Sequence, residues 1–291
     1  MTHNIAPAAE SATTRTAHRR RYLMCRPEHF TVSYTINPWM EPANPTDTAK
    51  AVRQWEALYD AYLGFGHEVH LIDPIEGLPD MVYTANGGFV IDGTAYGAKF
   101  RFAERGPEGP AFMDWFRDNG FTVADPVEVN EGEGDFLLVG DVILAGTGFR
   151  STGDSHREVG EVFGKEVVSL TLVDPRFYHL DTAIAVLDPV QGVENGGPEK
   201  ANIAYLPHAF DERSRSILAE RFPDAILVSD DDGAVFGLNS SSDGYNVIIS
   251  PRAVGFEAQL RERGYNPVMI DLSELLLGGG GIKCCTLELR R

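Results

Sequence analysis

Residues 278–289 of the chain read GGGGIKCCTLEL, a glycine-rich turn that leads into a short apolar strand. Four earlier segments have the same design, a polar turn followed by a strand that is apolar on alternate or all positions, and they lie at 84–90, 130–139, 178–186 and 238–249. Their landmark residues, which recur about every 45 to 60 positions, are Asn86, Glu133, His179, Asn239 and Cys284. The longest step contains residues 191–200, which we interpret as a polar hairpin loop.

An amphipathic helix and a second short strand accompany each landmark segment. Apolar residues at helical spacing predict helices over 46–63, 111–119, 155–163, 212–221 and 252–263. Short apolar strands follow at 69–72, 121–123, 167–172, 225–228 and 267–270. Five such α/β units predict a closed, pseudo-symmetric ring, because a ring lets each unit bury its helix and strands against two neighbours. The starts of the landmark strands are then expected to face one shared central site.

Composition limits the kinds of partner that the protein can have. The chain has 291 residues, 43% apolar and 23% charged, enough for one large domain or two small ones. Its 25 basic and 43 acidic residues give a net charge of −18, the wrong sign for binding phosphate backbones or anionic membranes. We therefore expect neither nucleic acid nor membrane as a partner, whereas a small cationic substrate is compatible with this charge.

Cysteine usage and the N-terminal sequence indicate a cytoplasmic protein. Three cysteines cannot form a disulfide framework, and no Cys/His cluster has the spacing of a zinc site. The arginine-containing N-terminus lacks the apolar run of a signal peptide, and an organelle transit peptide is a weaker alternative to a disordered tail. We predict a disordered tail over residues 1–21 and a single catalytic domain over residues 22–291.

Three landmark segments carry side chains that can take part in a reaction or bind a charged ligand. Cys284 follows the four-glycine turn, where backbone N–H groups and Lys283 are expected to favour its thiolate. His179 suits a general acid or base, and Asp181 is expected on the same strand face. Glu131, Glu133 and Asp135 are also predicted to share one face. Such a concentration of negative charge suits a bound guanidinium or ammonium group.

Five motifs together resemble the guanidino-group-modifying superfamily, also called penteins or the amidinotransferase-like fold. They are INPWM at 36–40, TANGG at 84–88, EGEGD at 131–135, FYHLDT at 177–182 and GGGIKCCTL at 279–287. The resemblance covers nearly the whole chain from about residue 22 onward. It implies a five-bladed α/β propeller of repeated ββαβ units with the active site at its centre, and a hydrolase that uses no metal or cofactor.

The resemblance also implies roles for the residues of these motifs. Cys284 would attack the guanidino carbon of the substrate and form a covalent intermediate, and His179 would protonate the leaving amine and then activate water. Glu133 would hold the guanidinium nitrogens, with Asp181 beside it. Relatives usually have Glu-Gly-Gly-Asp where this chain has one residue more, so Glu131 remains an alternative to Glu133.

Two asparagines and three arginines bear on the choice of substrate. Asn37 and Asn86 resemble positions of arginine dihydrolases, which convert arginine to ornithine, and a neutral amide can bind both a guanidinium and a ureido group. This favours an arginine dihydrolase slightly over a dimethylargininase. Family members present arginines to the α-carboxylate of the substrate, and the candidates for this role are Arg101, Arg105 and Arg150.

Two further functions remain open at this level. An amidinotransferase would replace water by an acceptor amine, and a protein that only binds arginine would have no use for the thiol. The presence of Cys284, His179 and Glu133 together favours an enzyme over a binding protein. The sequence is compatible with a homo-oligomer but does not fix the oligomeric state.

Overall fold

The computed structural model describes residues 15–192, 198 and 200–291, and its strands form five separate three-stranded sheets. In each sheet the middle strand pairs antiparallel with one neighbour and parallel with the other. A parallel pair needs a long crossover, and in every sheet a helix supplies it. The predicted five-bladed α/β propeller is therefore confirmed.

The strands of the five sheets follow one another in chain order. The first two sheets are β3 (Gly88–Ile91), β4 (Thr94–Gly97) and β5 (Thr122–Ala124), then β6 (Phe136–Val139), β7 (Val142–Thr147) and β8 (Glu166–Thr171). The next two are β9 (Ile184–Val186), β10 (Ile203–Tyr205) and β11 (Ile226–Leu227), then β12 (Ser241–Ser242), β13 (Asn246–Ile249) and β14 (Asn266–Met269). The fifth combines β15 (Leu287–Glu288), β1 (Arg21–Cys25) and β2 (Glu68–Ile72).

The fifth sheet closes the ring, because it joins the two ends of the chain. Tyr22 of β1 pairs with Glu288 of β15, and Leu23 pairs with Leu287. The same β1 pairs in parallel with β2. The C-terminal landmark segment thus becomes the inner strand of a sheet whose other two strands come from the N-terminal part of the chain, which brings Cys284 into the ring.

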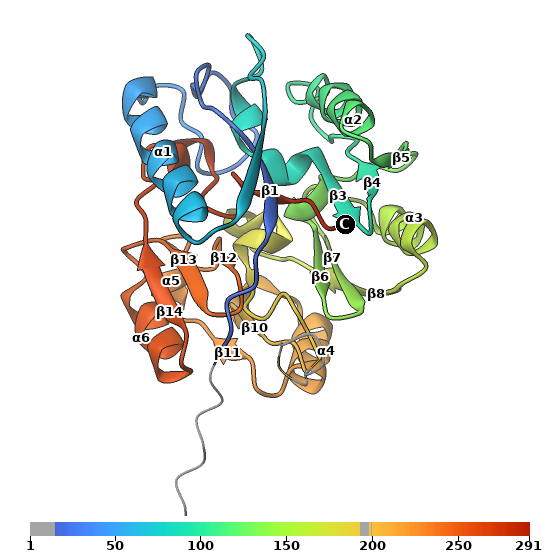
Figure 1. Ribbon diagram of the computed structural model, residues 1–291, viewed down its shortest axis with the longest axis vertical. Helices are drawn as coiled ribbons and strands as arrows, with labels where there is room; N and C mark the ends of the chain where they lie inside the picture. The colour runs from blue at the N-terminus through green and yellow to red at the C-terminus, as the bar shows by residue number, and fades with distance from the viewer. Residues whose placement is uncertain (1–14, 193–197, 199) are drawn as a thin grey trace, which may run out of the picture.

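The crossover helices lie on the outside of the ring, around the inner strands (Figure 1). They are α1 (Thr48–Gly64), α2 (Glu108–Asp118), α3 (Gly153–Phe163), α4 (Glu212–Arg221) and α6 (Val254–Glu262), with a further short helix, α5 (Asp230–Gly233). Each long helix buries part of its surface, and in α1 the buried face is apolar and includes Trp55 and Leu58. None of the described helices is long and apolar enough to cross a membrane.

The landmark segments differ from the prediction in one respect that matters for the site. Short 3₁₀ turns, not extended strand, precede three of the inner strands, and they span Thr84–Gly87, Gly132–Gly134 and Leu180–Thr182. Side chains in such a turn rotate by about 120° per residue instead of alternating. The expectation that Glu131, Glu133 and Asp135 share one strand face is therefore wrong. Cys284 likewise lies in a turn before β15, not within a strand.

Residues that precede the predicted domain boundary also contact the domain. Residues 15–21, which the sequence placed in a disordered tail, contact the domain: Arg15 forms an ion pair with Asp188 at 2.7 Å and stacks on Tyr265, and the His18 amide donates to the Asp243 carbonyl. This part differs from the predicted tail, whereas residues 1–14 lie outside the described residues. Most of the predicted 191–200 loop also lies outside them.

Candidate active site

The thiol of Cys284 is buried at the centre of a small polar cluster. Its residue is only 2% exposed, and Sγ donates to Asp181 Oδ2 at 3.3 Å. Asn239 forms two hydrogen bonds with the same cysteine: its Nδ2 donates to Sγ at 3.1 Å, and its Oδ1 accepts from the Cys284 amide at 3.2 Å. Asn239 Nδ2 also donates to the Asp181 carbonyl at 3.2 Å. The fourth and fifth landmark segments are thus joined at the thiol.

The imidazole of His179 is held by a carboxylate on one side and left free on the other. His179 is 1% exposed, and its Nε2 lies 2.7 Å from Glu131 Oε2. Since an ionised carboxylate only accepts, Nε2 carries the proton of this bond. His179 Nδ1 is buried and has no hydrogen-bond partner among the described residues. This nitrogen can exchange a proton with a bound molecule.

Glu131 is fixed as an ionised partner of the imidazole. Arg150 Nη1 donates to Glu131 Oε2 at 2.8 Å, and the Arg101 amide donates to Oε1 at 3.3 Å. Burial by itself raises the pKa of Glu131, but Arg150 and His179 outweigh it and hold that pKa well below its ordinary value. Glu131 therefore stays charged at neutral pH and fixes the orientation of His179.

Glu133 points away from His179, contrary to the role that the resemblance implied for it. Its Oε2 accepts from Lys283 Nζ at 2.7 Å and from the Glu288 amide at 2.8 Å, and its Oε1 pairs with Arg290 at 2.5 Å. The 3₁₀ turn between the two glutamates explains the difference, because it rotates positions 131 and 133 toward different neighbours. The structure brings Glu131, not Glu133, to the imidazole.

Asp135 supports the site from behind. Its Oδ2 accepts from the Ser151 hydroxyl at 2.6 Å, and its Oδ1 accepts from the Leu180 amide at 3.2 Å, one residue after His179. Burial raises the pKa of Asp135 to about 6. Asp135 thus ties the turn that carries His179 to the loop after β7.

The two predicted asparagines lie close to the site, each with a defined partner. Asn86 Oδ1 accepts from Arg105 Nη1 at 2.7 Å, and a side chain at Gly134 would collide with Asn86 Nδ2 and come within 3.2 Å of the His179 ring. Asn86 and His179 therefore flank the same glycine. Asn37 Nδ2 donates to the Gly278 carbonyl at 3.1 Å, so Asn37 fixes the glycine loop that precedes Cys284.

The three predicted arginines have different environments and do not form one carboxylate-binding group. Arg105 and Arg150 are buried, and their guanidinium groups form ion pairs with Glu108 and Glu131, each at 2.7 to 2.8 Å. The Arg101 side chain is exposed, and it is the Arg101 backbone that contacts Glu131. Of these three arginines, Arg105 and Arg150 are therefore engaged in ion pairs within the described part of the protein, and the Arg101 guanidinium is not.

The surroundings of Cys284 do not favour its thiolate in the free protein. Burial and the nearby Asp181 raise the pKa of the Cys284 thiol well above its ordinary value. Lys283, which the sequence suggested as an activating cation, instead directs its ammonium group to Glu133 and to the Thr286 carbonyl. Burial also raises the pKa of Asp181 to about 7, against the opposing effect of Lys283. A cation placed beside Sγ and Asp181 would stabilise both as anions.

Asn239 holds the thiol, although sequence reasoning assigned it no chemical role beyond its place as a landmark residue. Its position as the fourth landmark was the signal that could have identified it, since the other landmark positions lie at or near the same site. Among the residues that the structure describes, no group of three or more His, Cys, Asp or Glu side chains could hold a metal ion. The cluster offers a thiol, an imidazole and carboxylates as its reactive groups.

Two comparisons of sequence bear on the chemistry of this cluster, although no protein-family model matches the chain. The chain is 51% identical, over 99% of its length, to an N(G),N(G)-dimethylarginine dimethylaminohydrolase of Mycobacterium tuberculosis, and it covers 93% of that protein. It is 38% identical, over 92% of its length, to the bifunctional arginine dihydrolase/ornithine cyclodeaminase ArgZ of Synechocystis sp., of which it covers 37%.

Solved structures extend this similarity to three dimensions. The N-terminal domain of ArgZ, solved as a cysteine-to-serine variant bound to substrate, matches with a TM-score of 0.85 at 36% identity, covering 94% of this chain and 98% of that domain. An asparagine-to-serine variant of the same domain was solved covalently bound to a reaction intermediate. A dimethylarginine dimethylaminohydrolase adduct matches with a TM-score of 0.73 over 93% of this chain, but at 19% identity it shows a common fold alone.

Proposed function

Since the chain belongs to the guanidino-group-modifying superfamily of penteins, we propose that it is a thiol-dependent hydrolase of Nω-methylated arginine, a dimethylargininase. The 51% identity to the mycobacterial enzyme supports this substrate. The dihydrolases match at lower identity, 37 and 38%. This order is the reverse of the preference that Asn86 suggested from the sequence.

The observation that carries the proposal is a pair of unsatisfied polar atoms, one on the His179 imidazole and one on the carboxylate that contacts the thiol. His179 Nδ1 and Asp181 Oδ1 are both buried without a hydrogen-bond partner among the described residues. Buried polar atoms normally find partners, so these two mark the place of a polar ligand. A guanidinium supplies donors for Asp181, and its positive charge stabilises the Cys284 thiolate that the free protein disfavours.

The geometry supports a two-step reaction. With the cationic substrate bound, the Cys284 thiol gives up its proton to His179 Nδ1, and the resulting thiolate adds to the guanidino carbon. The bond from that carbon to the methylated nitrogen then breaks as the protonated His179 passes this proton to the leaving amine. Water, deprotonated by His179, then adds to the same carbon. The carbon–sulfur bond breaks, which releases citrulline and restores the thiolate. Glu131 holds the imidazole in place throughout and offsets its charge when it is protonated.

Arginine dihydrolase is the second candidate, and one observation favours it. Asn86 places a neutral amide beside His179, where it can accept or donate a hydrogen bond. A ureido product could remain bound at such a position and enter a second hydrolytic round. Asn37 lies on the glycine loop of the same site. Arginine would then yield ornithine, ammonia and carbon dioxide, without release of citrulline.

Product identification distinguishes these functions. The purified chain is incubated separately with asymmetric dimethylarginine, arginine and citrulline, and products are identified by mass spectrometry. We expect citrulline and dimethylamine from the first substrate. Ornithine from arginine would support the dihydrolase, turnover only with an added acceptor amine would support amidino transfer, and binding without any product would indicate an arginine-binding protein.

A pair of cysteine variants tests the nucleophile. We expect Cys284→Ser to lose turnover by at least about 10⁴-fold while the substrate still binds, because a serine hydroxyl is a far weaker acid and a far poorer nucleophile than a cysteine thiol. The matched control is Cys285→Ser, a neighbouring buried thiol outside the cluster, which should retain turnover within about tenfold. Full activity of Cys284→Ser would exclude the mechanism.

Two broader expectations remain proposals. The three cysteines are buried free thiols, which supports a reducing, cytoplasmic location. The homo-oligomeric state stays a prediction that sedimentation of the purified protein would test.

A further inference from the structure

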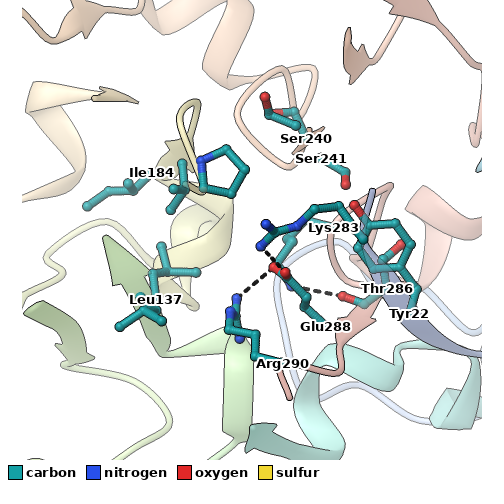
Figure 2. Close-up of a pocket in the computed structure, with 14 residues that line it drawn as sticks. Tyr22, Leu137, Ile184, Ser240, Ser241, Lys283, Thr286, Glu288 and Arg290 are labelled. Carbon is teal, nitrogen blue, oxygen red and sulfur yellow. Dashed lines mark hydrogen bonds and ion pairs between the residues drawn. The ribbon is translucent and has the colours of Figure 1, made fainter. Parts of the chain in front are cut away.

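A pocket that the thiol does not line includes Lys283, the residue before Cys284, in its wall (Figure 2). Its lining comes from the inner strands of four sheets, including Leu137 of β6, Ile184 of β9, Ser241 of β12 and Glu288 of β15. Neither Cys284 nor His179 lines it. We call this space the basic pocket, after the cations described next, and it has no part in the reaction proposed above.

Three cations meet at the basic pocket with fewer anions to balance them. Arg20, Lys283 and Arg290 line it, with side chains only 10 to 16% exposed. Glu288 pairs with Arg20 and Arg290, and Glu133 pairs with Lys283 and Arg290. Each cation therefore has a partner, but three positive groups share two carboxylates, so these five side chains carry a net positive charge. A chain of net charge −18 thus maintains a locally positive pocket.

Arg20 has a hydrogen-bond donor to spare. Its Nη2 is engaged by Glu288, but its Nε is buried and finds no acceptor among the residues that the structure describes. An arginine Nε in this situation is costly unless an acceptor is supplied from outside. Lys283 Nζ uses two acceptors, Glu133 and the Thr286 carbonyl, and an ammonium group has three donors.

The opposite wall of the basic pocket is apolar. It is formed by Tyr22, Leu137, Leu138, Ile184, Val186 and Pro189. Figure 2 shows Leu137 and Ile184 on one side, with Lys283 and Glu288 across from them. The cavity of about 40 Å³ is large enough for several water molecules or one small organic molecule. Its ligand therefore needs a compact anionic group and a short hydrocarbon part.

We propose that the basic pocket binds a monocarboxylate with a short aliphatic chain. The carboxylate would accept from Arg20 Nε and neutralise the excess positive charge, as charge-assisted hydrogen bonds to guanidinium groups do. The chain would lie against Leu138, Ile184 and Val186, where burial of each methylene adds affinity. A bare dianion suits the site less well, because the apolar wall gives it no partners.

Titration calorimetry on the full chain tests this proposal with butyrate, acetate, butylamine and inorganic phosphate as probes. We expect butyrate to bind more tightly than acetate, and butylamine not to bind. Phosphate binding tighter than butyrate, or no binding of butyrate, would overturn the proposal. Because no turnover is measured, the result does not depend on the reaction proposed for Cys284.

Variants locate the binding. Arg20→Gln should weaken butyrate at least about tenfold, since it removes the charge and Nε together. Leu138→Phe should weaken it by filling the apolar half, which keeps the test valid if Arg20→Gln does not fold. The matched control is Arg26→Gln, a partly exposed arginine paired with Glu56 away from the pocket, which should bind as the wild type does. If Arg20→Gln and Leu138→Phe both bound butyrate as tightly as the wild type, the binding site would lie elsewhere and the proposal would be refuted. Loss of butyrate binding on alkylation of Cys284 would also refute it.

Discussion

Glu131 and Glu133 are two residues apart, yet they belong to two different regions of the molecule. Glu131 lies in the candidate active site, between His179 and Arg150. Glu133 lies behind it, where it holds Lys283 and Arg290 at the wall of the basic pocket. Both are fully buried, and cations keep the pKa of both below the ordinary value despite burial. Burial and charge alone therefore do not identify a functional carboxylate, but the identity of its partner does.

The largest expected effect separates the two glutamates by their variants. Glu131→Gln should lower kcat by about 10² to 10³-fold, because the imidazole loses the anion that orients it and balances its charge. Glu133→Gln should leave kcat within about tenfold but destabilise the fold by about 3 kcal/mol, because Lys283 and Arg290 lose their shared partner. Steady-state kinetics and urea unfolding measure the two quantities on the same preparations.

The opposite result would exchange the two assignments. If Glu133→Gln lost the larger factor in kcat while Glu131→Gln remained active, the carboxylate assigned by the family motif would be the functional one. The two substitutions are chemically identical and both sites are fully buried, so each variant is the control for the other.

A smaller effect, on the reactivity of the Cys284 thiol, is expected from a substitution of Asn239 in the candidate active site. Asn239→Asp retains the acceptor for the Cys284 amide but loses the donor to Sγ and adds a negative charge. Both changes disfavour the thiolate and raise the thiol pKa further. Alkylation by iodoacetamide at pH 8 should slow by about tenfold or more. An unchanged alkylation rate would mean that Asn239 is merely a turn residue.

The smallest effect concerns Asp181 and the way in which the free energy of unfolding depends on pH. Asp181 has a folded-state pKa of about 7, above the ordinary value for Asp, so the wild type loses stability as pH rises from about 4 to about 7. Asp181→Asn removes this loss. Its free energy of unfolding relative to the wild type should therefore increase over that window, by no more than about 1.4 kcal/mol per pH unit, and level off above pH 7.

Glu131→Gln provides the matched comparison, with the opposite sign. The pKa of Glu131 is depressed in the folded state, so its contribution to stability is present above the ordinary Glu pKa and is lost as pH falls below it. The advantage of the wild type over Glu131→Gln should thus shrink under acid conditions. Parallel urea titrations from pH 3 to pH 8 would reveal both slopes, and equal slopes for the two variants would contradict the assigned environments.

Local sequence patterns were sufficient to predict the ring, and they led to Cys284 and His179 as the proposed reactive pair. The recurrence of turn, strand and helix gave all five long helices to within a few residues, as with 212–221 and α4 (Glu212–Arg221). Equivalence of the landmark positions indicated that Cys284 and His179 lie near one centre. Hydrophobic periodicity and repeat length are local properties of the sequence, so both can be recognised without knowledge of long-range contacts.

The direction of individual side chains could not be obtained this way. Alternation placed Glu131, Glu133 and Asp135 on one face, but a 3₁₀ turn sends them to His179, Lys283 and Ser151 respectively. Whether four residues form a strand or a tight turn depends on what they pack against. The thiol environment was misjudged for the same reason, since Lys283 adjoins Cys284 in sequence but forms its ion pair with Glu133, 150 positions away.

Periodicity and spacing along the chain are thus enough to predict the repeat, the closed α/β ring and the residue types expected at its centre. Three-dimensional contacts are needed to show that Glu131 orients His179, that Asn239 holds the thiol, and that Arg105 and Arg150 are occupied by ion pairs. The tertiary structure also revealed the basic pocket, whose cations come from both ends of the chain. Partners of buried charged groups are chosen by three-dimensional proximity, because in a low-dielectric interior each charge must find the nearest compensating group.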